Sequence, residues 1–289
     1  MLIRKSKVIG LALNLVQMCN ACVYCWNRSQ RERSGLPTDE LGLDTNVAEL
    51  VTQLEHDQLP KPEPSERCQF YESHGHDILL GAKAEFLHPA ARSVARRVIS
   101  LLEVYPMVSS RCRLLTKQSV VPFLGKIPND VWIGTTITTL NDDIASTVEP
   151  GAVKVSQRRL NLHLAHDLGF KTWLVVEPFF KDMQLDQLIA MIPFVEEIWV
   201  GRLNSSRNIV TTEGRMSGFT CGELAETDEG IASRFSEMMW AIQDNATGPH
   251  KPRVYLKREM FRYIEREHPT LIDLLDKHVV ESARAGGRA

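Results

Sequence analysis

The chain has 289 residues, with 34 basic and 36 acidic side chains and a formal net charge of −2. Apolar residues make up 43% and charged residues 24% of the sequence, which is ordinary for a globular protein with a sizeable core. This composition excludes a disordered, collagen-like or low-complexity chain. The near-neutral charge argues against a protein that acts mainly by covering nucleic acid or anionic membrane with positive charge, although it allows a local basic groove.

The N-terminal segment has some features of a signal peptide. Arg4, Lys5 and Lys7 precede an apolar run over 8–16, but Asn14 interrupts the run and no small-x-small cleavage site follows it. No stretch approaches the ~18 consecutive apolar residues of a membrane span. We therefore expect a soluble, cytoplasmic protein that is not inserted in a membrane.

Short apolar runs alternate with amphipathic segments along most of the chain. The runs that predict strands are 8–16, 68–73, 111–116, 131–137, 172–176 and 197–200. The segments with helical spacing are 46–58, 89–104, 120–124, 155–168 and 185–192, with Gly169 ending the fourth. A loop over 203–222, a helix over 230–243, a short strand over 253–256 and a charged helical end should follow.

This alternation of strands and helices predicts an α/β fold with crossover connections and a parallel sheet. Six strands, where a closed barrel has eight, indicate a partial (β/α)6 TIM-type barrel. We expect residues 1–202 to form this core. Residues 203–289 should form a C-terminal α+β extension, either a lid or a substrate lobe. Functional side chains would then lie at the carboxyl ends of the strands.

A triplet of cysteines directly follows the first predicted strand, and its members are Cys19, Cys22 and Cys25. In a reducing compartment such a triplet indicates metal binding, because six cysteines in the whole chain are too few for a disulfide scaffold. Three thiolates suit a [4Fe–4S] cluster with one iron left open. The alternative is a structural zinc site, whose fourth ligand would be Cys68, His74 or His76. The spacing alone does not decide between the two.

The segment 14–28 (NLVQMCNACVYCWNR) resembles the cluster loop of radical S-adenosylmethionine (SAM) enzymes, in particular the spore photoproduct lyase-like branch. Tyr24 matches the aromatic residue before the third cysteine, although the first gap is one residue shorter than in the usual C-x3-C-x2-C. Further pieces resemble segments of that branch in the same order: 70–78 (FYESHGHDI), 114–119 (LLTKQS), 135–139 (TTITT), 148–151 (VEPG), 158–160 (RRL) and 174–178 (LVVEP). Their order and spacing together make the resemblance specific.

The resemblance implies a partial TIM barrel with one [4Fe–4S] cluster on the three cysteines and with SAM bound at the open iron. In such enzymes the reduced cluster cleaves SAM, and a 5′-deoxyadenosyl radical then abstracts hydrogen from the substrate. An electron donor such as flavodoxin or ferredoxin is implied as a partner.

Several residues are candidates for binding SAM. By resemblance, Tyr24 packs near the adenine, and Lys117 and Arg159 are candidates for the carboxylate. Thr136 and Thr138 point to one side of their strand and would bond ribose or carboxylate if that side faces the barrel interior. Lys117 is otherwise a solvated lysine after a strand, and the threonines are otherwise ordinary strand residues. Because adjacent helix residues do not share a face, either Arg159 or the arginine before it should face solvent.

The segment 70–78 departs from its lyase relatives, which carry a cysteine there that returns a hydrogen atom to the product. Alignment of the segment puts His74 at that place. Imidazole is a poor hydrogen-atom donor but a good acid, base or hydrogen-bond partner. We therefore predict His74 and Glu177 as catalytic residues at a polar substrate end, with structural roles as the alternative. Glu149, in Glu-Pro-Gly, is expected only to order its loop.

The sequence thus predicts a radical SAM enzyme of lyase or mutase type that abstracts hydrogen from an organic substrate. By resemblance the substrate is a thymine-type base in DNA, and the missing cysteine favours modification or rearrangement over photoproduct repair. The alternatives are radical SAM modification of a peptide or small metabolite, and a non-catalytic zinc-binding protein, which the shortened spacing favours. The basic tail over 251–266 would contact nucleic-acid phosphates or form a solvated helix.

Overall fold

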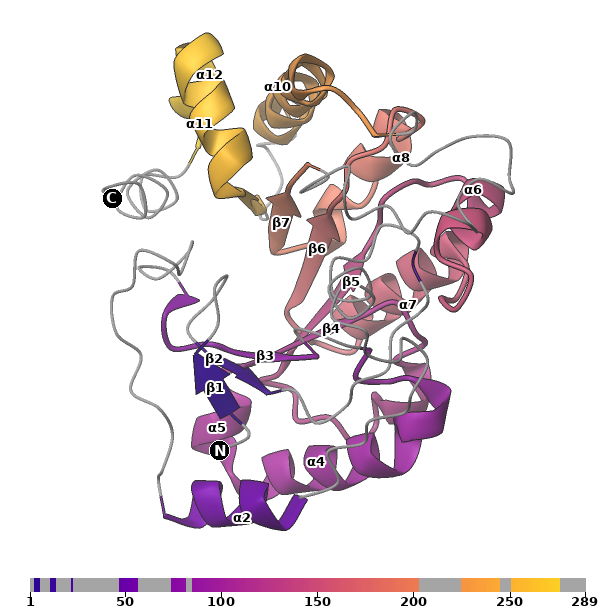
Figure 1. The fold of residues 1–289 in the computed structure, drawn as a ribbon, viewed down its shortest axis with the longest axis vertical. Coiled ribbons are helices and arrows are strands. Elements are labelled where there is room, and N and C mark those ends of the chain that lie inside the picture. Colours follow the sequence, from indigo (N-terminus) through magenta and orange to yellow (C-terminus); the bar gives the residue numbers. More distant parts are fainter. Residues whose placement is uncertain are drawn as a thin grey trace, which may run out of the picture.

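The computed structural model of the chain describes residues 3–5, 11–13, 22, 47–56, 74–81, 85–202, 225–244 and 251–275. Its centre is an eight-stranded sheet in which the strands follow one another in chain order (Figure 1). The strands are β1 (Ile3–Lys5), β2 (Leu11–Leu13), β3 (Ile78–Leu80), β4 (Cys112–Thr116), β5 (Trp132–Thr136), β6 (Thr172–Val176), β7 (Glu197–Val200) and β8 (Arg253–Leu256). β1 pairs antiparallel with β2, and all strands from β2 to β8 run parallel.

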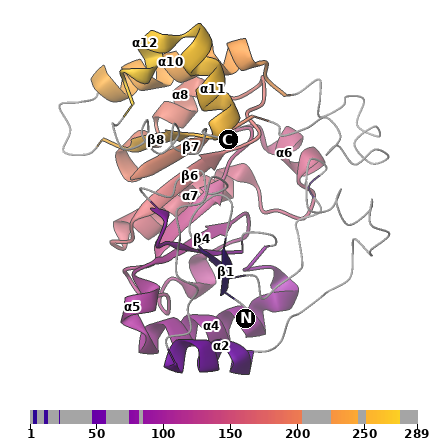
Figure 2. The ribbon, with the colours of Figure 1, turned by 60° about the vertical axis from the view of Figure 1, so that its left-hand side comes forward.

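Helices lie in the connections between the strands and after the last strand, β8. They are α2 (Val47–Glu55), η1 (Pro89–Ala91), α4 (Arg92–Val104), α5 (Pro106–Ser109), η2 (Val121–Phe123), α6 (Asp142–Val148), α7 (Val155–Asp167), α8 (Leu185–Ile189), η3 (Ile192–Phe194), α10 (Asp228–Asp244), α11 (Arg258–Glu267) and α12 (Pro269–Ile272). Both views place α2 and α4 near the β1–β3 end of the sheet and α10 to α12 at the β7–β8 end (Figures 1 and 2).

The predicted α/β class with a parallel sheet is confirmed, and two details are corrected. The second parallel strand is Ile78–Leu80, which pairs with both β2 and β4, while the predicted run 68–73 lies outside the described residues. The parallel part of the sheet also has one strand more than the six predicted, because Arg253–Leu256 pairs with β7. The division at 202/203 stays a prediction, although this strand from the C-terminal region belongs to the same sheet.

The sheet curves, so that one of its faces is concave. Arg113 in β4 and Glu197 in β7 lie three strands apart, about 14 Å along a flat sheet. Their Nη1 and Oε2 atoms nevertheless lie 2.8 Å from each other. Both residues therefore face the interior of an open barrel. Among the described residues β1 and β8, the two edge strands, do not pair with each other, which agrees with a partial barrel.

Alternation along the strands assigns further side chains to this concave face. The register of the strands groups the residues of the concave face into layers, in which residues of neighbouring strands lie opposite one another. The layer nearest the amino ends contains Trp173, Glu197 and Arg253, and the next contains Val175, Trp199 and Tyr255. One further step along the three strands gives Glu177, Gly201 and Lys257, whose backbones continue the ladder through Gly201 N to Val176 O and Lys257 N to Val200 O.

A glycine is required on this face at the middle of β5. A Cβ atom at Gly134 would overlap the indole of Trp173 on the adjacent strand. We expect Gly134→Ala to lower the free energy of unfolding by about 1–3 kcal/mol, because the well-packed indole has to move. Urea unfolding measures this change. Gly125→Ala is the matched control, since nothing lies within 4 Å of a Cβ there, and an equal loss in both variants would contradict the explanation.

No helix among the described residues is long and apolar enough to cross a membrane.

Candidate functional site

The carboxyl ends of the parallel strands bring together residues that are far apart in the sequence. Lys117 follows β4, Thr138 lies just beyond β5, and Glu177 follows β6. Cys22 lies on the chain after β2 and is buried. By strand alternation Lys117, Thr138 and Glu177 all belong to the concave face. The sequence prediction that functional side chains collect at this edge therefore agrees with where the structure places these residues.

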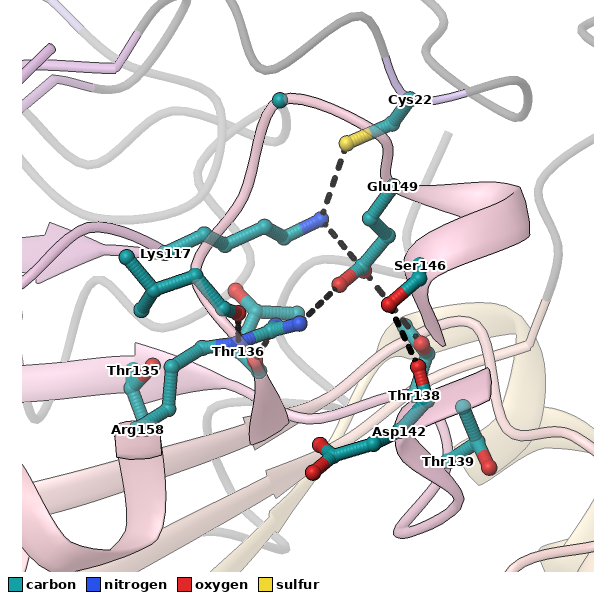
Figure 3. Close-up of polar contacts among 12 residues, drawn as sticks. Cys22, Lys117, Thr135, Thr136, Thr138, Thr139, Asp142, Ser146, Glu149 and Arg158 are labelled. Atoms are coloured by element: carbon teal, nitrogen blue, oxygen red, sulfur yellow. Dashed lines mark hydrogen bonds and ion pairs between the residues drawn. The ribbon is translucent and has the colours of Figure 1, made fainter. Parts of the chain in front are cut away.

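The ammonium group of Lys117 lies between the sulfur atom of Cys22 and the carboxylate of Glu149 (Figure 3). Its Nζ is 3.4 Å from Cys22 Sγ and 2.9 Å from Glu149 Oε1. Burial alone would lower the pKa of Lys117, but the charges of Cys22 and Glu149 outweigh it and hold the pKa above its ordinary value. Lys117 therefore stays positively charged throughout the physiological range. The alternative of a solvated lysine does not agree with this burial, because only 14% of the side chain is exposed.

Glu149 holds Lys117 in place and is itself held by other side chains. Its carboxylate is fully buried and forms an ion pair with Arg158 of α7. The hydroxyl of Thr138 donates a hydrogen bond to Glu149 Oε1 at 3.3 Å. Figure 3 shows this carboxylate between the lysine and the arginine. The expectation that Glu149 only orders its loop was thus incomplete, because it orients a cation at the end of the neighbouring strand.

The backbone around Lys117 is also fixed. Glu85, in the loop after β3, accepts hydrogen bonds from Lys117 N at 2.8 Å and from Thr116 Oγ1 at 2.5 Å. The carbonyl of Lys117 accepts a bond from Val153 N at 3.0 Å. Glu85 gave no signal in the sequence, because it is a single acidic residue in a loop of ordinary composition. The position of the ammonium is therefore determined from both its backbone and its head group.

Arg158, and not Arg159, is the arginine that reaches the site. Arg158 is 2% exposed and also donates to Thr136 O at 2.7 Å and Val153 O at 2.9 Å. Arg159 is exposed and has Gln187 Oε1 at 3.4 Å from its Nη1. The prediction of Arg159 as a cofactor-binding residue is corrected accordingly. The expectation that one of the two arginines faces solvent is confirmed. The rotation of α7 about its own axis turns Arg158 inward and Arg159 toward solvent.

The remaining predicted cofactor residues are placed only in part. Thr136 and Thr138 are buried near the triad Lys117, Glu149 and Arg158. Cys19, Tyr24 and Cys25 lie outside the described residues, so their predicted roles remain predictions. No group of three or more metal-ligating side chains occurs in the part of the chain that the structure describes, which includes only Cys22 of the triplet.

A second charged pair lies at the same edge of the sheet. Lys257, which follows β8, forms an ion pair with Glu177, and the two side chains are 17% and 15% exposed. A Cβ atom at Gly201 would lie 3.0 Å from both the Glu177 carboxyl group and Lys257 Cδ. The absence of a side chain at this position therefore lets the pair meet over the end of β7. Sequence reasoning found Glu177 and did not find Lys257.

His74 lies at the opposite end of the strands. It precedes β3, is 2% exposed, and has Asp77 Oδ2 at 2.9 Å from its Nδ1. Arg113 Nε lies 2.5 Å from the same Asp77 oxygen, and Arg113 in turn pairs with Glu197. The structure therefore does not bring His74 to the edge that holds Lys117. Its place in a buried network at the amino ends favours the structural alternative over the predicted catalytic role.

This amino-end network predicts a pH dependence of stability. Burial alone would raise the pKa of Asp77, but the hydrogen bonds and charges of His74 and Arg113 outweigh it and lower the pKa. Because the pKa of Asp77 is lower in the folded state than its unfolded-state value of about 3.9, the ionised carboxylate stabilises the fold at pH values above that unfolded-state value. This stabilisation is lost as the pH falls through the folded-state pKa. We expect Asp77→Asn to lower the free energy of unfolding by roughly 1.5–3 kcal/mol at neutral pH.

Chemical unfolding across the acid range checks this expectation. The gap between wild type and Asp77→Asn should close as pH falls, because the wild-type carboxyl group then becomes neutral as well. A gap of constant size at every pH would show that the ionised carboxylate is not what stabilises the network.

No protein-family model matches the chain, and no curated protein matches it. Solved structures do match its fold. Spore photoproduct lyase complexed with dinucleoside spore photoproduct has 14% sequence identity and a TM-score of 0.48 over 92% of this chain. Two variants of that lyase, one of them with the same dinucleoside, have 13% and 14% identity and TM-scores of 0.48 and 0.46. The chain is similar in fold to spore photoproduct lyase. It spans 63% of the length of these lyase chains, and at this identity the likeness concerns the fold alone.

The geometry itself defines what the edge can do. A cation with little exposure lies beside a buried thiol, and such a cation favours the thiolate, which is the form that binds metals. A permanently charged ammonium group at the mouth of a barrel also suits a ligand carboxylate. The pair Glu177 and Lys257 adds a second polar position on the β6–β8 side of the same mouth.

Proposed function

We propose that the chain is a radical SAM enzyme. It holds a [4Fe–4S] cluster on Cys19, Cys22 and Cys25, binds SAM beside Lys117, and abstracts hydrogen from an organic substrate. The observation that supports this most strongly is the position of Lys117 Nζ, 3.4 Å from Cys22 Sγ and 2.9 Å from Glu149 Oε1. Three segments of the chain meet there at the carboxyl edge of a parallel sheet.

The described residues fit these groups. Cys22 is buried next to a cation, which favours the thiolate form that binds metals, and Lys117 keeps its charge because of its surroundings. When bound, the cluster and SAM supply hydrogen-atom abstraction through one-electron cleavage of SAM. Lys117 would bind the methionine carboxylate of SAM, while Glu149 fixes the direction of the ammonium group. Thr138 already donates to Glu149, so its part is to orient that carboxylate.

The substrate in this proposal is a thymine-type base in DNA, which is modified or rearranged rather than repaired. The polar substrate end of the barrel is formed by Glu177. A flavodoxin- or ferredoxin-type protein would supply the electron, and a cytoplasmic location would keep the thiols reduced. The resemblance of the sequence to the lyase-like branch supports these assignments.

The role of Lys117 is tested by measuring SAM affinity in anaerobically reconstituted protein. We expect Lys117→Met to weaken SAM binding about 10- to 100-fold, the contribution of a hydrogen bond between charged groups. Release of 5′-deoxyadenosine under dithionite should fall with it. Arg159→Met removes an exposed cation from the neighbouring helix and should leave the affinity unchanged. Equal SAM affinity in wild type and Lys117→Met would contradict the assignment.

A further inference from the structure

The ion pair between Glu177 and Lys257 occupies a position at which it could contact a substrate. Both residues stand one step beyond the carboxyl ends of their strands and on the concave side, in the same layer as Gly201. Their side chains are only partly buried, at 15% and 17% exposure. They are separated along the sheet from Lys117 by the end of β5. The mouth of the barrel thus has two polar regions, one on each side of that strand.

The layer below this pair is apolar and aromatic. It consists of Val175, Trp199 and Tyr255, none of which is more than 5% exposed. Hydrogen bonds to charged groups are stronger in such surroundings than in water. The chain also has glycine at position 201, the residue type that leaves room for the two side chains to meet. A polar pair at this position is suited to recognition, because it presents two opposite charges side by side at the mouth of the barrel, above the apolar layer.

The charges of the pair limit the groups that it can bind. A phosphate or carboxylate would be attracted by Lys257 but repelled by Glu177 beside it. A cation would be attracted by Glu177 but repelled by Lys257. A group that carries a hydrogen-bond donor next to an acceptor satisfies both side chains. The imide edge of a pyrimidine is such a group, because its ring N–H lies directly beside a carbonyl oxygen.

We infer that Glu177 and Lys257 form the subsite that recognises the imide edge of a pyrimidine base. Glu177 accepts the N3–H hydrogen bond, and Lys257 donates to the neighbouring carbonyl oxygen. The choice of a base as ligand rests on the proposed function, whereas the requirement for an adjacent donor and acceptor rests on the pair itself. Lys257 comes from the C-terminal region, so the inference gives that region a part in substrate specificity.

Equilibrium binding of thymidine and of N3-methylthymidine to the reconstituted, SAM-loaded chain tests this subsite. The methylated nucleoside keeps the ring and both carbonyl groups but lacks the N–H donor. Wild type should prefer thymidine by about 10- to 100-fold. Glu177→Leu should bring the ratio to about one, and the isosteric Glu177→Gln should leave only a small preference, because a neutral acceptor is weaker. Lys257→Met should weaken both ligands by similar factors.

Asp228→Asn is the control variant, because it disrupts the nearby Arg202–Asp228 pair without touching the subsite. It should keep the wild-type preference, and circular dichroism should show that every variant is folded. The inference is overturned if thymidine does not bind, if wild type binds both nucleosides equally, or if a glutamine-containing dipeptide replaces thymidine in a Glu177-dependent way. Release of 5′-deoxyadenosine without the thymidine preference would leave the proposed function in place and refute only the subsite. A thymidine preference without SAM cleavage would support the subsite and refute the proposed function.

Discussion

The Cys22→Ala variant should lose the iron–sulfur absorbance after anaerobic reconstitution, and its release of 5′-deoxyadenosine should fall more than about 100-fold. Cys22 is the cysteine of the triplet that the structure places beside Lys117, with 3.4 Å between Sγ and Nζ. Loss of residues that merely support a metal ligand already costs about 10- to 100-fold, so loss of the ligand itself should cost more. Iron content and product release, measured together, check the expectation.

The control for Cys22 is another buried cysteine, which lies within the sheet. Cys112 opens β4 and is 1% exposed, and alternation places it on the outward face, away from the mouth. Cys112→Ala should keep the wild-type iron content and product yield. If the two variants lost iron to the same degree, the effect would come from destabilisation of the fold and the cluster assignment to Cys22 would fail.

Glu149→Gln should lower the free energy of unfolding by about 3–5 kcal/mol. The change keeps the size of the side chain but removes the one negative charge that Lys117 and Arg158 share in the described part of the site. Arg158 is almost completely buried, and a buried charge that loses its partner is strongly destabilising. Urea unfolding of wild type and variant measures the difference.

An exposed acidic residue provides the comparison for Glu149. Glu259, on the outer surface of α11, should change the free energy of unfolding by less than about 0.5 kcal/mol when replaced by glutamine. A similarly small effect of Glu149→Gln would mean that the carboxylate does not hold the two cations in solution. The position of Lys117 beside Cys22 would then need another explanation.

Local sequence patterns were sufficient to predict the positions of most strands of the sheet. β6, β7 and β8 begin and end where the apolar runs predict, because each run is short and rich in bulky apolar residues. β3 was misplaced because its three residues, Ile78–Leu80, are too short for a periodicity to be recognised. The added β8 shows that the order of strands in the sheet depends on pairing between distant segments, which local patterns do not encode.

The candidate site was predictable where a residue follows a strand. Lys117 and Glu177 could be placed at one edge from strand direction alone. His74 was placed at the wrong end because the strand after it was assigned to the residues before it. The choice between Arg158 and Arg159 depended on the rotation of α7 about its axis, and the contact of Glu149 with Lys117 depended on the return of a loop. Neither has a signature in the sequence.

Anaerobic reconstitution of the full chain with iron and sulfide, followed by electron paramagnetic resonance with and without SAM, shows whether the chain holds a [4Fe–4S] cluster with one open iron. We expect about four iron and four sulfide per chain and a reduced-cluster spectrum that changes when SAM is added, because one iron has no protein ligand. A colourless protein that retains only zinc would contradict this expectation. So would a cluster whose spectrum is unaffected by SAM because a fourth side chain already occupies the open iron.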